Sequence, residues 1–179
     1  MKFLIMTIFL LTFVLNIIFP QNNHRTNLES FYEKPILDEN ITLPLSWSSY
    51  DNFDELFKHI GKPIKEIPTT DDSRFNTGGN YTRGFMYEYF SVSAVYLAFK
   101  DIIYVYLIWL DMTDEILYNH SIRKNDSPNR IMELFGNPLY IENLDNGNME
   151  YSYKTNDRAQ VNFQFADKKL ISIIFIFMT

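Results

Sequence analysis

The chain has 179 residues, of which 46% are hydrophobic and 17% aromatic, so it is long enough to bury a substantial core in one compact domain. Its formal charge of −6 argues against nucleic-acid binding, because that affinity rests mainly on Lys and Arg side chains that neutralise phosphates. The absence of cysteine excludes disulfides, thiolate metal sites, cysteine nucleophiles and a lipidated N-terminal cysteine.

The N-terminus carries a long apolar run that follows Lys2, continues to Phe19 and gives way to Pro20 and a polar stretch. A basic start, an apolar core and a polar exit are typical of a secretory signal, so we expect export. The run approaches the lower limit for spanning a bilayer, and it lacks the small residues of a cleavage site. We predict that residues 1–20 are a signal peptide or membrane anchor, with the anchor favoured.

The rest of the chain is predicted to contain two repeats of one structural unit. Residues 21–50 show no clear period and read as a linker or lead-in. Residues 51–111 form the first unit, residues 112–126 a connector, and residues 127–179 the second unit. We expect an α+β fold of two repeats, each a short helix packed on an antiparallel sheet of about four strands, preceded by an N-terminal hydrophobic helix.

The first predicted helix begins after Asp51, which we expect to cap it, and ends at Gly61. Its apolar residues have the spacing of a helix that lies on a sheet: Phe53, Leu56, Phe57 and Ile60.

The second predicted helix is capped by Ser127, has Pro128 in its first turn and ends at Gly136. Its apolar stripe consists of Ile131, Leu134 and Phe135. The two helices therefore match in their caps, their stripes and their terminal glycines.

Alternating apolar residues predict the strands of each unit. Val95, Leu97 and Phe99 precede one tight turn, and Val161, Phe163 and Phe165 precede another. The ladders correspond at an offset of 66 residues and the helices at an offset of 75, so the first unit has about nine extra residues. We place them in an exposed loop within residues 69–84, since that stretch is rich in Gly and Asp.

The last strands of the units are predicted at residues 102–110 and 170–178, where β-branched and aromatic residues are frequent. Alternation places Val105, Leu107 and Trp109 beneath the helix. It places Tyr104, Tyr106 and Tyr96 on the opposite face, and these three side chains form the candidate tyrosine surface.

A family resemblance accompanies these features. Residues 121–127, the stripe that ends at Gly136-Asn137-Pro138, and the ladder from Val161 onward look like the repeat of β-lactamase-inhibitor-protein-like and SmpA/OmlA-like domains. The resemblance covers most of residues 53–178. It implies an exported α+β module that acts by binding other proteins, with paired repeats forming a curved sheet whose free face contacts the partner.

The candidate site is therefore a partner-binding surface. Tyr96, Tyr104 and Tyr106 are predicted on an uncovered sheet face, where aromatic side chains supply contact area at low entropic cost, and Asp71 and Asp72 support it from the loop. The alternative is that this face is covered by the other repeat, by the lead-in or by oligomerisation.

The sequence offers little sign of catalysis. His24, His59 and His120 have no metal-ligand spacing, and no nucleophile elbow, phosphate-binding glycine loop or dinucleotide fingerprint is present. We expect no metal, no cofactor and no enzymatic activity. The rival hypothesis is a small envelope hydrolase in which Asp71 or Asp72 meets His59 or His120.

We therefore expect a non-catalytic protein-binding module, exported or membrane-anchored through its N-terminal segment. Its place would be the extracytoplasmic side of a bacterial cell envelope, anchored in the inner membrane or secreted to the periplasm. The partner would be another protein: an enzyme or toxin if the chain is an immunity or inhibitor protein, or an envelope component if it is an assembly or structural protein.

Overall fold

The computed structural model describes residues 36–38, 41–42, 49–68, 77–112, 117–118, 122–155 and 159–177. These ranges contain two short helices and thirteen strands. The bounds are β1 Ile36–Asp38, β2 Ile41–Thr42, β3 Ser49–Tyr50, α3 Phe53–Ile60, β4 Lys65–Ile67, β5 Tyr81–Met86, β6 Phe90–Leu97, β7 Ile102–Asp111, β8 Leu117–Tyr118, β9 Ile122–Arg123, α4 Pro128–Phe135, β10 Tyr140–Asn143, β11 Met149–Thr155, β12 Ala159–Ala166 and β13 Lys169–Phe177.

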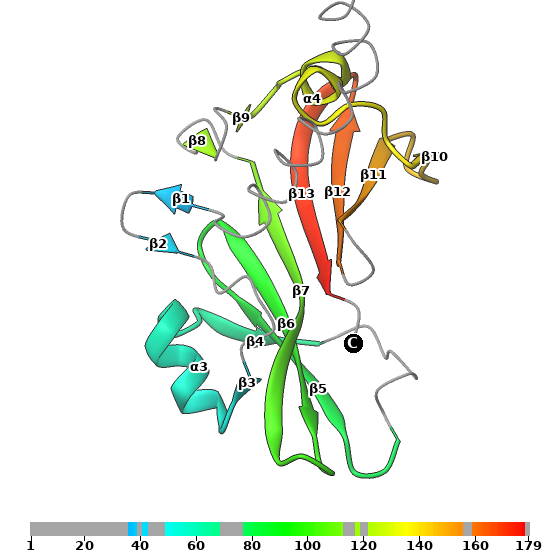
Figure 1. Ribbon diagram of the computed structural model, residues 1–179. Coiled ribbons are helices and arrows are strands. Elements are labelled where there is room, and N and C mark those ends of the chain that lie inside the picture. The colour runs from blue at the N-terminus through cyan, green and yellow to red at the C-terminus, as the bar shows by residue number, and fades with distance from the viewer. Residues whose placement is uncertain are drawn as a thin grey trace, which may run out of the picture.

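A single antiparallel sheet of nine strands dominates the fold. Its order is β10-β11-β12-β13-β7-β6-β5-β4, and β3 pairs with the other end of β7. The strands of each half are therefore neighbours in sequence order, and the halves meet where β13 pairs with β7 (Figure 1). This arrangement confirms an α+β fold built on an antiparallel sheet.

Helix α3 has its expected length but a different cap. The N-cap is Asn52, not Asp51 as predicted, because Asn52 is extended and its Oδ1 accepts a hydrogen bond from the Glu55 N–H at 2.9 Å. The Glu55 carboxylate in turn accepts from the Asp51 N–H at 2.8 Å. Leu56 is fully buried, and the Phe57 ring meets the Phe85 ring of β5 edge-on at 5.0 Å.

Helix α4 begins and ends as predicted. The Ser127 Oγ accepts a hydrogen bond from the Arg130 N–H at 3.2 Å, and Pro128 takes the first turn, where its missing N–H has no cost. Ile131 is fully buried, and the Phe135 ring stacks on Phe163 of β12 at 5.5 Å. The helix is thereby fixed to the second half of the sheet.

Both helices lie on the same face of the sheet. Ile108 and Leu110 of β7 pair with Phe175 and Ile173 of β13, and all four side chains belong to the main core together with the residues beneath α3 and α4. Because directly paired residues point to the same side of a sheet, one continuous core runs under both helices.

The two helices end in the same way. Gly61 and Gly136 have φ values of +85° and +79° together with extended ψ values. Residues other than glycine rarely adopt this backbone conformation. The Gly61 carbonyl accepts a hydrogen bond from the Tyr87 hydroxyl at 3.2 Å, and the Gly136 carbonyl accepts one from Tyr153 at 3.0 Å. The separation from glycine to tyrosine is 26 residues in the first half and 17 in the second, an excess of nine.

A β-bulge interrupts the pairing of β6 with β7. Ala94 pairs with Val105, but the preceding residue Ser93 pairs with Leu107, so Tyr106 is an extra residue on β7. An extra residue shifts the side-chain alternation by one position.

Because of this shift, part of the predicted alternation along β7, the last strand of the first unit, is wrong. Val105 faces the helices as expected, but Leu107 and Trp109 do not, and Ile108 and Leu110 take the core positions in their place. Sequence alternation alone cannot reveal the bulge, because every candidate residue in this strand is apolar.

The predicted segments map onto the structure as follows. Residues 1–20 lie outside the described residues, and no helix in the part of the chain that the structure describes is long and apolar enough to cross a membrane. The predicted lead-in contains β1, β2 and β3, and the predicted connector contains β8 and β9. The predicted end of the loop within residues 69–84 is wrong, because β5 begins at Tyr81.

Candidate functional site

The three tyrosines predicted to share a face do not share it. Tyr96 pairs with Ile103 and lies on the side of α3, where its ring stacks on Tyr81 at 5.0 Å. Its hydroxyl donates a hydrogen bond to the Asp101 Oδ1 at 2.7 Å, and this bond raises the pKa of Tyr96. The predicted alternation of β6 is one position out of phase with the structure, so the prediction that Tyr96 belongs to the binding surface is wrong.

Tyr104 and Tyr106 do lie on the face opposite α3 and α4, which we call the helix-free face because no described helix covers it. Tyr106 is only 6% exposed and packs with Val95 and Leu97, while Tyr104 is half-buried beside them. The same alternation, by putting Tyr96 on the opposite face, predicts Val95 and Leu97 beneath the helices, and this prediction is also wrong. This apolar cluster of Val95, Leu97 and Tyr106 gives Tyr106 a packing role within the fold.

A cluster of polar side chains occupies the helix-free face of the second half. Asn162 Nδ2 donates to Glu150 Oε1 at 2.6 Å, and Gln164 Nε2 donates to Glu150 Oε2 at 2.8 Å. The Ser172 hydroxyl donates to Gln164 Oε1 at 3.0 Å. These four residues, which we call the polar cluster, are each 9% exposed or less and come from three adjacent strands.

Strand register places three members of the polar cluster, Ser172, Gln164 and Glu150, in one row across the sheet. Asp111, Ser172, Gln164, Glu150 and Glu142 are successive cross-strand partners on β7, β13, β12, β11 and β10. The two ends of the row are exposed, whereas its centre is buried. The row therefore offers exposed carboxylates on either side of a hydrogen-bonded centre.

The adjacent row mixes aromatic and polar groups. Trp109, Ile174, Asn162, Ser152 and Tyr140 are its successive partners. Trp109 is half-buried, and its indole N–H donates to the Asp111 Oδ1 at 3.0 Å, which fixes the orientation of the ring. An oriented tryptophan beside fixed amides is a surface suited to specific contact with another molecule.

The hydrogen bonds of the polar cluster hold its side chains in fixed positions. Glu150 accepts an amide hydrogen bond at each carboxylate oxygen, and Asn162 Oδ1 accepts a further bond from Gln160 Nε2 at 2.8 Å. Buried polar side chains that satisfy one another hold a single geometry. Across the described ranges, no three His, Cys, Asp or Glu side chains gather as metal ligands.

The residues of the hydrolase hypothesis are not brought together in the described structure. His59 is exposed on α3, with its ring 5.5 Å from that of Tyr50. Asp71, Asp72, His24 and His120 lie outside the described residues. The proposed support of the binding surface by Asp71 and Asp72 falls on the same undescribed segment.

On the helix side, an ion pair stabilises the β4 edge of the sheet. Arg83 of β5 donates from Nε to the Glu66 Oε1 at 2.8 Å, and its guanidinium lies 4.8 Å from the centre of the Phe53 ring. The hydrogen bond from Arg83 lowers the pKa of the Glu66 carboxyl. Since both side chains are substantially exposed, we expect this pair to contribute less than about 1 kcal/mol to stability.

Comparison with known proteins adds a structural neighbour. No protein-family model matches the chain, and no curated protein matches its sequence. The crystal structure of YjgB from Bacillus subtilis, a DUF4309 family protein, is similar with a TM-score of 0.50 and 12% sequence identity. The match covers 88% of this chain and 97% of the YjgB chain. A likeness at this level of identity shows a shared fold.

Proposed function

We propose that the chain is a non-catalytic protein-binding module whose partner docks on the helix-free face of the second half and of the adjoining strand β7. The observation that carries this proposal is that the buried polar cluster and the oriented Trp109 lie on the same face of the sheet. Half-buried Leu107 and Ile176 add apolar area in the next row. Protein interfaces combine such an aromatic anchor with polar groups held in fixed positions.

The charges on this face define the partner's chemistry. Asp111 and Glu142 are exposed at the ends of the row that contains Glu150, and the chain as a whole has a formal charge of −6. A partner with Lys or Arg side chains spaced across the face would be steered to it and oriented on it. The biological setting we propose is an immunity or inhibitor protein that neutralises such a partner outside the cytoplasm of a bacterial cell.

We propose further that the two halves arose by duplication of one helix-plus-sheet unit, with the apolar N-terminal segment as signal peptide or anchor. The matching glycine–tyrosine hydrogen bonds support the duplication, as does the mirrored order of strands around β7 and β13. The basic start and apolar core of residues 1–20 support the export signal.

The test compares partner capture by two sets of variants in the native cells. Trp109→Ala with Leu107→Ala removes the half-buried apolar part of the face, whereas Phe99→Ala removes a side chain that is 74% exposed in the β6–β7 turn. We expect the first variant to lower recovery of a specific partner by at least about tenfold, as for an interface hot spot, and the control to leave it unchanged. Equal recovery with both variants, each confirmed as folded by circular dichroism, would overturn the proposal.

A further inference from the structure

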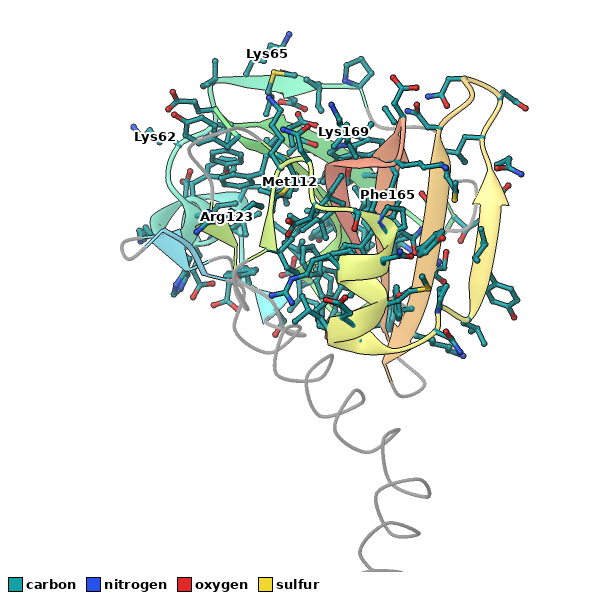
Figure 2. All side chains as sticks on the ribbon, turned by 90° about the horizontal axis from the view of Figure 1, so that it is seen from above. Lys62, Lys65, Met112, Arg123, Phe165 and Lys169 are labelled. Carbon is teal, nitrogen blue, oxygen red and sulfur yellow. The ribbon has the colours of Figure 1, made fainter. Side chains whose placement is uncertain are left out.

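The two outer strands of the sheet are protected to very different extents. β4 is three residues long, contains Lys65 and Glu66, and lies between Pro63 and Pro68. Short length, charge and proline are the usual means by which proteins prevent an edge strand from pairing with another chain. Figure 2 shows Lys62 and Lys65 pointing outward on this side of the molecule.

The opposite edge, formed by β10, is more apolar and more exposed. β10 lies beyond β11 at the end of the sheet, and within the described structure no strand pairs with its outer side (Figures 1 and 2). Three consecutive apolar residues are more than half exposed there: Leu139 at 54%, Tyr140 at 65% and Ile141 at 58%. An edge strand also presents N–H and C=O groups on its outer side, and such groups are satisfied by another extended backbone.

We propose that β10 pairs antiparallel with β10 of a second copy of this chain, with Ile141 at the centre of the two-fold contact. The sequence of the strand is self-complementary in this register. Ile141 meets Ile141 of the second copy on the α4 side of the sheet, because Ile141 pairs with Tyr151, a core residue of that side. Tyr140 meets Glu142 twice, so each phenol is placed opposite a carboxylate that can accept its hydrogen bond.

Neighbouring registers are less favourable for identifiable reasons. In a two-fold antiparallel pair, only residues on the same face can lie opposite each other, so the centre must fall on a residue. A centre at Glu142 would place two carboxylates directly opposite, which destabilises the pairing. A centre at Tyr140 would bring Pro138, which has no N–H, into the ladder. The centre at Ile141 avoids both problems.

This contact does not depend on the proposed partner-binding function, because it uses the edge of the sheet and not the polar cluster or Trp109. Pairing through β10 would join the two sheets edge to edge and continue the helix-free face from one copy to the other. The strand contributes four residues, so the contact is smaller than a standard stable interface of about 1,600 Å². Covalent trapping is therefore a more suitable test than size measurement in dilute solution.

The test uses the absence of cysteine from the chain, which makes any introduced thiol unique. Ile141→Cys in the full-length protein, oxidised in the cells that produce it, should yield a disulfide-linked dimer with twice the mass of 21.3 kDa. Directly opposite residues in an antiparallel pair have Cα atoms about 4.5–5.5 Å apart, which is within the range of a disulfide. Phe99→Cys, at an exposed position far from β10 in sequence, measures random collision.

Two further variants define the register. Tyr140→Cys alone should cross-link several-fold less than Ile141→Cys, whereas Tyr140→Cys combined with Glu142→Cys should restore a strong dimer band. Adding Ile141→Lys to this double variant should abolish the band, because it places two positive charges opposite each other. Cross-linking of Ile141→Cys no stronger than that of Phe99→Cys would overturn the proposal. So would Tyr140→Cys cross-linking more strongly than Ile141→Cys.

Discussion

In the first half of the molecule, the helix-free face is apolar, and Val95, Leu97 and Tyr106 are buried together there. In the second half the same face is polar, and Glu150 and its amide donors are buried in its centre. On the helix side, the halves agree: each sheet half has an aromatic ring against the helix and a tyrosine bonded to the terminal glycine. The two halves therefore share the packing of the helix side and differ in the chemistry of the opposite face.

The similarity of the two halves on the helix side is tested by truncating one buried phenylalanine in each half, Phe85 and Phe163. Phe85 and Phe163 are 2% and 0% exposed, and each contacts a helix ring. We expect Phe85→Ala and Phe163→Ala each to lower the free energy of unfolding by about 3–5 kcal/mol, because each leaves a large cavity. Urea unfolding monitored by circular dichroism measures both. A loss below about 1 kcal/mol in one half alone would show that the two positions are not equivalent.

The difference between the two halves on the helix-free face is tested by replacing Glu150, the carboxylate at the centre of the polar cluster. Glu150→Ala leaves the buried amides of Asn162 and Gln164 without their acceptor, so we expect a loss of about 1–3 kcal/mol in the free energy of unfolding. Glu142→Ala, an exposed change in the same row, should stay within about 0.5 kcal/mol. Equal effects of the two variants in urea unfolding would contradict a bonded polar centre.

The smallest expected effect concerns the glycine–tyrosine hydrogen bonds. Tyr87→Phe and Tyr153→Phe each remove one hydrogen bond to a helix-end carbonyl, so each should cost about 0.5–1.5 kcal/mol at neutral pH. The two losses should be similar. Helix-end fraying in only one half, measured by amide hydrogen exchange near Gly61 and Gly136, would weaken the comparison.

The same tyrosines predict an alkaline dependence. Burial raises the pKa of both Tyr87 and Tyr153 above the ordinary value of 10.0. Above that value the unfolded tyrosines lose their protons while the folded ones keep them, so the free energy of unfolding falls as pH rises. Unfolding measured from neutral pH to pH about 11 should show this fall. The double variant Tyr87→Phe/Tyr153→Phe should show a shallower one.

The helices could be predicted because their signals are local. Ser127, Pro128, Gly61 and Gly136 each act within one helical turn, and the structure places all four where the sequence indicates. The cap at Asn52 instead of Asp51 is an error of one position between two residues that both cap well. The α+β fold follows from these helices and from the long apolar strands.

The faces of β6 and β7 could not be predicted because they depend on long-range pairing. The bulge at Tyr106 has no local signal in a strand where Ile103, Tyr104, Val105 and Leu107 are all compatible with burial. The bulge accounts for the wrong faces of Leu107 and Trp109. Tyr96, Val95 and Leu97 lie on β6 opposite residues 102–104, which precede the bulge, so their faces depend on the register of β6 on β7.

The polar cluster was missed because its members are far apart in the chain. Glu150, Gln164 and Ser172 become neighbours only when the register of β11, β12 and β13 is known. A signal was nevertheless present, since Gln160, Asn162 and Gln164 alternate with the buried ladder of β12. Three amides on one side of an otherwise apolar strand indicate that the second side is also organised.

The position of β13 affects how a newly made chain acquires its structure. β13 follows all other described strands in the chain, yet it lies between β12 and β7. While the chain is being synthesised from its N-terminus, residues 107–111 of β7 therefore lack their β13 partner until the final strand emerges, whereas Ile103 and Tyr104 can already pair with β3. During that interval the unpaired N–H and C=O groups of this apolar segment form an edge that another chain can pair with.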